Sequence, residues 1–200
     1  MNLNIKKIGN EDVLLASEIL VDAFQTDNGM SNLFNTDSQK YLQQLQSWFI
    51  ATLKMQISSN QILWGIFKEN SVIALAIVTK HSALISPFVL FKWTISVLIN
   101  CSWKTILKTM AHDKYRQQFY ISKNQYILEF IAVSPKHQGQ GLSKLLFNKI
   151  HELTEKKTIW LETTKAQNVN IFNKFGYKKI KETKENNIIY HIMTLEKEMK

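Results

Sequence analysis

Residues 126–143 read YILEFIAVSPKHQGQGLS. The first eight are almost all apolar, which is typical of a strand in the middle of a sheet with both faces covered. Pro135 ends that strand because proline has no amide to donate to a neighbouring strand. Two glycines follow, and then apolar residues recur every three or four positions, as on one face of a helix. The stretch predicts a buried strand, a glycine turn and a helix in direct succession.

The turn between this strand and this helix is suited to binding a phosphate. The first amides of a helix have no partner within the helix and lie at the positive end of its dipole. Gly139 and Gly141 let a ligand approach the backbone closely, and Lys136 and Lys144 add positive charge at the rim. The dinucleotide fingerprint would need a third glycine where Lys144 stands. On these residues alone, an ordinary strand-to-helix turn is an equal alternative.

The segments on either side alternate between strand and helix patterns. Upstream we expect a strand at 5–8, a helix over 10–24, a loop at 27–37, a helix over 41–53 and a hairpin of 61–67 with 71–78. Downstream we expect a strand at 158–163, a helix over 168–175 and a closing hairpin of 177–183 with 188–195. The pattern predicts a single α/β domain over residues 1–200, with a mixed, mainly antiparallel sheet flanked by helices.

An insertion at about 83–118 interrupts this order. Residues 83–107 are the most apolar part of the chain, but a proline, an asparagine and two lysines interrupt them. A membrane-spanning helix needs about 20 mostly apolar residues without such breaks. We therefore expect a buried or semi-buried helix and no stable membrane insertion, with contact to a membrane surface as the alternative. Four aromatic residues of the insertion are interpreted as core, with the wall of an apolar acceptor pocket as the alternative: Phe88, Phe91, Trp93 and Trp103.

The overall charge favours an anionic ligand or partner. Lys and Arg number 25 against 16 Asp and Glu, a formal net charge of +9. A nucleic-acid-binding surface usually carries clustered arginines or a recognition helix, whereas this chain has one arginine, Arg116. We therefore expect no nucleic acid as partner.

The remaining composition limits the covalent and metal chemistry. The single cysteine, Cys101, excludes an intrachain disulfide and fits a reducing compartment. The five histidines lack the short paired spacings of a zinc site, so we expect no metal. The first residues lack the apolar run of a signal peptide, so we expect a cytoplasmic protein. No oligomeric state follows from the sequence.

Residues 129–177 resemble the cofactor-binding half of the GNAT family of N-acetyltransferases. The family signature is Gln or Arg, two residues, Gly, one residue, and Gly or Ala, and this chain has Gln138, Gly141 and Ser143 at those positions. Residues 168–177 are similar to a family segment whose asparagine contacts the pantetheine arm of the cofactor. The close resemblance covers about the last third of the chain.

The resemblance implies an acyltransferase with acetyl-coenzyme A (acetyl-CoA) as cosubstrate. The turn would hold the pyrophosphate, and the edge of the strand would pair with the pantetheine as an added strand does. The thioester would lie where two parallel strands splay apart. The cofactor-binding half would span about residues 126–195. The implied cofactor-binding residues are Ile131, Ala132, Val133, Gln138, Gly139, Gln140, Gly141, Leu142, Ser143, Asn168 and Phe172.

Two groups are candidates for catalysis. By the resemblance, the amide of Val133 would stabilise the oxyanion that forms on attack. Glu129 is the candidate general base, because a carboxylate in an otherwise apolar strand loses solvation and becomes more basic. Exposure to solvent or pairing with a lysine is the alternative, and Glu162 is the reserve candidate. Phe172 stands where the family often has the tyrosine that protonates the leaving thiolate, so water or another residue would have to serve.

We therefore expect direct transfer of an acetyl group to a primary amine of a small molecule or a peptide, with no covalent acyl-enzyme. The alternative is a non-catalytic module that senses coenzyme A, which Phe172 favours. His112 and Tyr115 of the insertion are interpreted as structural, with contact to the acceptor as the alternative.

Overall fold

The apolar segment expected at the centre of the sheet is β4 (Tyr126–Val133), the fourth of seven strands. The computed structural model describes residues 3–155 and 157–196. The strand order is β1-β2-β3-β4-β5-β7-β6, and every neighbouring pair is antiparallel except β4 with β5. The other strands are β1 (Leu3–Lys7), β2 (Ile62–Lys68), β3 (Ser71–Lys80), β5 (Ile159–Thr163), β6 (Lys178–Glu185) and β7 (Ile188–Leu195). The predicted mixed, mainly antiparallel sheet is confirmed.

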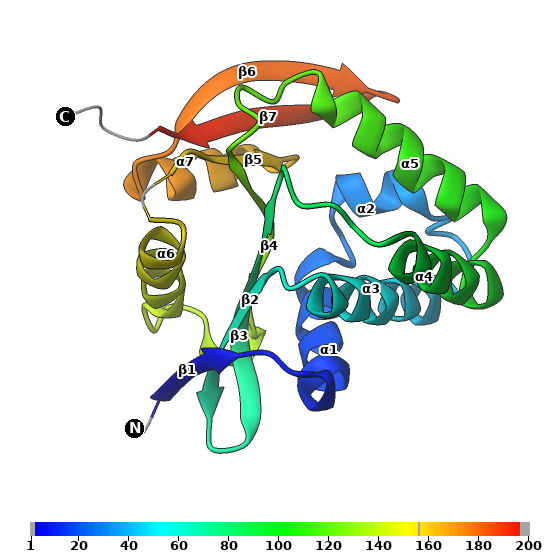
Figure 1. The fold of residues 1–200 in the computed structure, drawn as a ribbon, viewed down its shortest axis with the longest axis horizontal. Helices are drawn as coiled ribbons and strands as arrows, with labels where there is room; N and C mark the ends of the chain where they lie inside the picture. The colour runs from blue at the N-terminus through cyan, green and yellow to red at the C-terminus, as the bar shows by residue number, and fades with distance from the viewer. Residues whose placement is uncertain (1–2, 156, 197–200) are drawn as a thin grey trace.

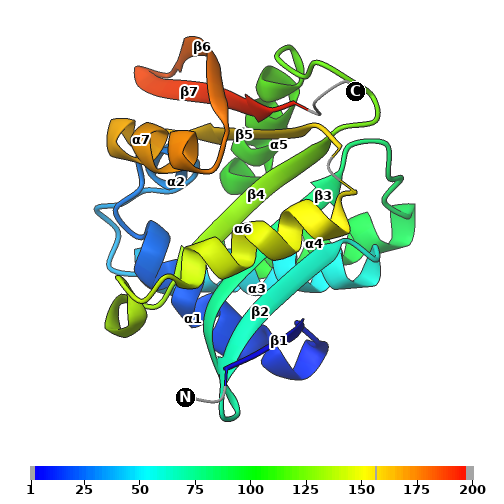
Figure 2. The same ribbon diagram turned by 90° about the vertical axis from the view of Figure 1, so that its left-hand side faces the viewer.

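Helices cover both faces of this sheet, as Figures 1 and 2 show. The helices on one face are α1 (Val13–Phe24), α2 (Asn28–Leu33), α3 (Tyr41–Ser58), α4 (Pro87–Asn100) and α5 (Trp103–Gln117). The helices on the other face are α6 (Leu142–Leu153) and α7 (Ala166–Lys174). Single 3-10 turns lie at Asn10–Asp12 and Pro135–His137. None of the described helices is long and apolar enough to cross a membrane.

The sheet separates two apolar cores. On the α3 side, Leu45, Phe49 and Leu53 are fully buried, and their spacing of four places them on one helix face. On the α6 side, Leu146 and Phe147 are fully buried in the same way. Each such side chain stabilises the fold by about 1.5–3 kcal/mol when it leaves water. The two cores fix the helices on either side of β4.

The pairing between β4 and β5 is very short. It joins Tyr126 to Ile159 and Ile127 to Trp160, and the two strands then part. From Leu128 onward, β4 keeps its pairing with β3 on one edge only. The edge that faces β5 is therefore open over the rest of β4, as the resemblance to GNAT proteins implies.

The region around residues 27–37, expected as a loop, contains the short helix α2. The carboxylate of Asp27 accepts hydrogen bonds from the amides of Gly29 (2.8 Å) and Met30 (3.3 Å), which caps the helix. Six residues are too few for a repeating apolar pattern, so the prediction of a loop was wrong here. The other elements begin and end within a few residues of their predicted bounds.

The insertion forms two helices, and only one side of α4 is buried. Trp93 and Val97 face α3, where the indole Nε1 of Trp93 donates a hydrogen bond to Thr52 Oγ1 (3.2 Å). Phe91, on the opposite side, is 62% exposed. The prediction of a semi-buried helix is correct for α4, but of the four aromatic residues expected in the core only Trp93 is there. The other three, Phe88, Phe91 and Trp103, are exposed.

The two sides of α4 should therefore respond differently to truncation. We expect Trp93→Ala to lower the free energy of unfolding by about 3–5 kcal/mol, because it leaves a cavity against α3. Phe91→Ala is the matched control on the same helix and should change it by less than about 0.5 kcal/mol. Urea unfolding of the two variants measures both values. Equal losses would mean that the outer side of α4 is also packed.

Candidate functional site

The glycine turn presents unpaired amides at the start of α6. Gly139 and Gly141 have φ angles of +77° and +76°, which glycine adopts without strain. A Cβ atom added at either glycine would meet nothing within 4 Å, so the space beside this backbone is open. In the described chain, the amides of residues 139–143 have no hydrogen-bond acceptor. Five donors at a helix N-terminus form a site for an anion of phosphate size.

The predicted turn residues lie together along this backbone. Leu142 is buried and anchors the first turn of α6 in the core, while Ser143 is half-buried beside it. Lys136 and Lys144 are exposed at either end of the turn. The remaining predicted members are exposed: Gln138, Gly139, Gln140 and Gly141.

The open edge of β4 ends where this turn begins. The amide of Ser134 donates to Ile73 O in β3 (2.9 Å), so the amide of Ser134 points toward β3. Successive residues of a strand point their backbone groups to opposite edges, so Val133 and Ile131 point theirs into the gap between β4 and β5. Gln138 Nε2 lies 3.5 Å from Val133 O on that side. Ala132, the third predicted strand residue, points its backbone groups toward β3.

A β-bulge in β4 brings Glu129 to the other side of the sheet from α6. Ile77 pairs with Phe130 and Val78 with Leu128, so Glu129 is the extra residue. A bulge lets two successive side chains point to the same face. Phe130 packs in the core under α3, and Glu129 lines a cavity beside it. The bulge was not visible in the sequence.

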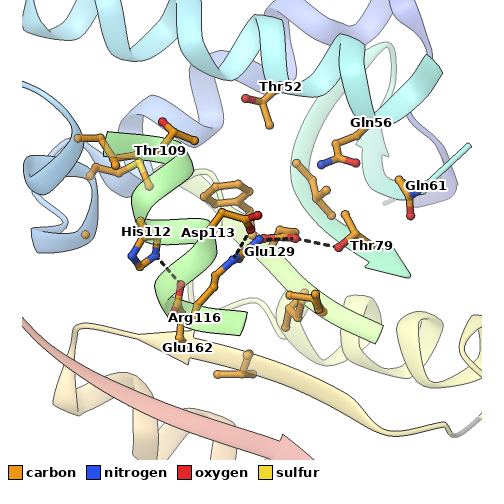
Figure 3. A pocket seen from close by; sticks show the side chains of 18 of the residues that line it. Thr52, Gln56, Gln61, Thr79, Thr109, His112, Asp113, Arg116, Glu129 and Glu162 are labelled. Carbon is orange, nitrogen blue, oxygen red and sulfur yellow. Dashed lines mark hydrogen bonds and ion pairs between the residues drawn. The ribbon is translucent and has the colours of Figure 1, made fainter. Parts of the chain in front are cut away.

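Glu129 is held by three hydrogen bonds, which Figure 3 shows. Arg116 donates to both carboxylate oxygens, at 2.6 and 3.1 Å, and Thr79 Oγ1 donates at 2.8 Å. The sequence predicted apolar surroundings for Glu129, with pairing to a lysine as one alternative. In the structure Glu129 instead forms a bidentate ion pair with an arginine. A carboxylate offers about four lone-pair sites, so about one stays open for a further donor. The role of Glu129 as general base stays a prediction.

Glu162, the reserve candidate, is held by the same helix. His112 Nε2 lies 2.9 Å from Glu162 Oε1, and His112 Nδ1 lies 2.6 Å from Glu185 Oε2. A neutral imidazole has one N–H, so a bridge to two carboxylates requires the doubly protonated ring. Burial lowers the pKa of His112, but the hydrogen bond and charge of Glu162 and the hydrogen bond of Glu185 outweigh burial and raise it above its ordinary value. His112 is thus a positively charged link from α5 to β5 and β6.

A cavity of about 490 Å³ lies between the sheet and helices α3, α4 and α5. One end reaches the gap between β4 and β5, where Ile131, Asn168 and Phe172 line it. Asn168 Nδ2 donates to Thr163 Oγ1 (3.2 Å), and Phe172 is buried against the rings of Phe147 and Tyr177. Ile85, Leu90 and Met110 line the other end and are 37–62% exposed. The cavity therefore connects the surface to the open edge of β4.

The cavity combines apolar walls, an acidic floor and unpaired polar atoms. Four carboxylates line it, from Asp27, Asp113, Glu129 and Glu162, against three cations, Lys80, Arg116 and protonated His112. Four buried polar atoms at its walls have no hydrogen-bond partner among the described residues: Trp48 Nε1, Gln56 Oε1, Thr109 Oγ1 and the hydroxyl of Tyr190. Buried polar atoms are nearly always paired, so these four point to a polar ligand or water in the cavity.

The sequence reasoning missed most of the acceptor side of this site. Arg116, Thr52, Gln56 and Tyr190 all line the cavity, and none belongs to a motif. They come from α3, α5 and β7, and only the fold brings them together. His112 was set aside as structural, and it links α5 to two carboxylates while also lining the cavity. Among the described residues, no group of three or more His, Cys, Asp or Glu side chains could hold a metal ion.

Residues 106–197 match a family model described as an acetyltransferase (GNAT) domain. The match runs from within α5 to just beyond β7 and includes the glycine turn, so the resemblance found in the sequence is confirmed. No curated protein matches the sequence.

Several solved structures share the fold over nearly the whole chain. One is described as a histone acetyltransferase and related acetyltransferase from Corynebacterium glutamicum, with TM-score 0.74, 14% identity and coverage of 100% of this chain and 99% of that one. A second is a PaiA N-acetyltransferase from Thermoplasma acidophilum in complex with coenzyme A, with TM-score 0.60, 13% identity and coverage of 98% of this chain and 99% of that one. A third is an N-acetyltransferase from Staphylococcus aureus, with TM-score 0.58, 12% identity and coverage of 97% of this chain and 96% of that one. At these identities the likeness is one of fold.

The charged bridge at His112 predicts how stability depends on pH. Because the pKa is raised in the folded state, the bridge stabilises fully below the unfolded value of about 6.5, and its contribution is lost as the pH rises through the folded-state value. We expect the melting temperature of the wild type to fall toward that of His112→Gln as the pH is raised from about 6 to about 9. Thermal unfolding across this range measures the difference.

His81→Gln is the control for this measurement. His81 lines the same cavity, packs edge-to-face against Tyr120 and makes no ion pair among the described residues. It should keep the pH dependence of the wild type. Parallel pH curves for the wild type and His112→Gln would show that the bridge is not charged.

Proposed function

We propose that this chain, which carries a GNAT-type acetyltransferase domain over residues 106–197, transfers the acetyl group of acetyl-CoA directly to a primary amine of a small molecule or peptide. The observation that carries the proposal is the open edge of β4, which lies between a turn with free amides and a cavity with an acidic floor. A cofactor bound along that edge would present its thioester to the cavity. Cytoplasmic location is part of the proposal, and the single cysteine, Cys101, fits it.

The cofactor-binding side rests on backbone groups. The free amides of residues 139–143 would hold the pyrophosphate, with Lys136 and Lys144 adding charge at the rim. The backbone groups of Ile131 and Val133 would pair with the amide groups of the pantetheine arm in the gap. Asn168 and Phe172, at the far side of the gap, would contact the arm from α7. No metal is needed for any of these contacts.

The chemistry would occur where the gap opens into the cavity. The amide of Val133 would donate to the thioester oxygen and stabilise the negative charge that develops on attack. The acceptor amine would lose a proton to Glu129, through the lone pair that Arg116 and Thr79 leave free. The carbon–sulfur bond then breaks, the nitrogen loses its second proton, and water carries that proton to the thiolate, because Phe172 has no proton to give.

The cavity supports an acceptor that is cationic and largely apolar. Its acidic floor attracts an ammonium group in a chain whose overall charge is +9. Its volume lies within the range of small-molecule sites and would also admit the end of a peptide. The unpaired atoms of Trp48, Gln56 and Thr109 would then find partners on the acceptor. A module that only senses coenzyme A would need no such cavity, which favours the enzyme.

The glycine turn gives a direct test of cofactor binding. Gly141→Glu should abolish acetyl-CoA binding, because the new side chain enters the open space beside the free amides and its charge repels the pyrophosphate. Asn148→Glu adds the same charge at an exposed position later in α6 and should bind as the wild type does. Isothermal titration calorimetry with acetyl-CoA measures both. Unchanged affinity in a folded Gly141→Glu variant would refute this assignment.

The role of Glu129 needs a test that separates catalysis from pairing. Glu129→Gln should lower kcat by about 10²- to 10⁴-fold with acetyl-CoA affinity unchanged, as expected for the loss of a general base. It should also destabilise the protein by about 3–5 kcal/mol, because it leaves the buried Arg116 without its main partner. Thiol release with a panel of amines measures the rate.

The double variant Glu129→Gln/Arg116→Gln distinguishes the two roles, because it removes both charges. Stability should return while the rate stays low if Glu129 is the base. If the rate returns with stability, Glu129 only holds α5 in place. Asp113→Asn removes the exposed partner of Arg116 and is the control for general disturbance of the arginine.

A further inference from the structure

Helices α4 and α5, together with Leu84 just before α4, expose many large apolar side chains, which we call the α4–α5 apolar surface. Its members are Leu84, Phe88, Phe91, Ile95, Leu98, Ile99, Trp103, Leu107 and Met110. Phe88, Phe91 and Met110 are 62–63% exposed and Ile99 is 75% exposed. Single exposed apolar residues are ordinary, but so many of them on two neighbouring helices point to an interaction site.

The exposed residues of α4 form a stripe of their own. Phe88, Phe91, Ile95 and Ile99 recur every three or four positions, which places them on one side of the helix. The buried residues Trp93 and Val97 lie on the opposite side and already fix α4 to α3. The fold therefore does not need the outer stripe, and no described element covers it. Figure 1 shows α4 as an outer helix beside α3.

The charges around this surface have one sign. From His81 to His112 the chain has no Asp or Glu, while Lys92, Lys104 and Lys108 are all exposed. Lys92 Nζ lies 4.4 Å from the ring of Phe88, and Lys104 Nζ lies 5.9 Å from the ring of Trp103. Exposed aromatic and aliphatic residues flanked by lysines are typical of helices that lie in the headgroup region of an anionic bilayer.

The same charges argue against a second copy of the chain as the occupant. A symmetric dimer through this surface would bring the lysines of both copies together, with no acidic residue in the segment to pair with them. An anionic lipid surface supplies the missing negative charge and accepts the apolar side chains. We propose that the α4–α5 apolar surface docks peripherally on a bilayer that contains anionic lipids.

Docking in this way would place the mouth of the cavity at the bilayer. Ile85, Leu90 and Met110 line the outer end of the cavity and are themselves exposed beside the apolar surface. An acceptor would then enter from the headgroup region. Amines with an apolar body accumulate there, because the charged amine contacts the anionic headgroups and the apolar body contacts the acyl chains. This agrees with the apolar walls and acidic floor of the cavity.

Vesicle sedimentation with the full chain tests the proposal without any cofactor, so its outcome is independent of the proposed acetyl transfer. The chain should sediment with vesicles of phosphatidylcholine and phosphatidylglycerol in equal parts, less so at high salt, and not with phosphatidylcholine alone. Each lysine near an anionic surface contributes roughly a fivefold gain in affinity, so Lys92→Gln/Lys104→Gln/Lys108→Gln should bind about 100-fold more weakly. The control Lys7→Gln/Lys123→Gln/Lys178→Gln removes three exposed lysines elsewhere and should lose far less.

A second pair of variants tests the apolar contribution. Phe91→Ser/Ile99→Ser should lose binding to the anionic vesicles and keep the thermal stability of the wild type, because both side chains are exposed. Leu14→Ser/Leu42→Ser changes two exposed leucines on α1 and α3 and should bind as the wild type does.

Three outcomes would overturn the proposal. One is failure of the wild type to bind the anionic vesicles. Another is equal loss of binding in a variant and its control. The third is a lipid-free dimer, seen in sedimentation equilibrium, that Phe91→Ser/Ile99→Ser dissociates, because the occupant would then be a second copy of the chain.

Discussion

The short parallel pairing between β4 and β5 is the constraint on which the rest of the site depends. After Ile127 pairs with Trp160 the strands part, and the backbone groups of Ile131 and Val133 are left without a neighbour on that edge. Buried backbone groups that stay unpaired cost about 1–3 kcal/mol each. The cores on both faces of the sheet hold β4 in place despite this cost. The open edge is therefore maintained by packing elsewhere, and it is available to any extended molecule that offers donors and acceptors in the spacing of a strand.

Helix α5 supplies the charges that complete the other side of the gap. The one arginine of the chain, Arg116, holds Glu129 through two parallel hydrogen bonds, a geometry that the flexible ammonium of lysine cannot reproduce. One turn earlier, His112 joins Glu162 on β5 to Glu185 on β6. The insertion is thus tied to three strands by ionic contacts, while α4 is tied to α3 by apolar ones. This division explains how a segment with such an apolar sequence can form the wall of a polar cavity.

The sequence predicted the centre of this fold well and its surroundings poorly. An unbroken apolar strand, a proline and two glycines constrain the backbone locally, so β4, the turn and α6 followed from residues 126–153 alone. The partner of Glu129 could not be found in this way, because Arg116 lies thirteen residues earlier in a segment without a motif and the bulge that turns Glu129 toward it depends on pairing with β3. The outer stripe of α4 was misread for a related reason. Apolar residues at helical spacing look the same whether a protein core or another surface covers them.

The bulge at Glu129 also affects how this strand can change by insertion and deletion. Because β4 has one residue more than β3 needs, loss of Glu129 alone would join Leu128 to Phe130 in regular alternation and leave every apolar contact of the strand on its present face. Loss of Leu128 or Ile131 would instead place successive side chains on one face and turn part of the strand over. A single codon deletion could therefore remove the carboxylate from the cavity floor while the sheet kept its register. Such a deletion would leave the guanidinium of Arg116 without its main partner, so a matching change at Arg116 would have to accompany it.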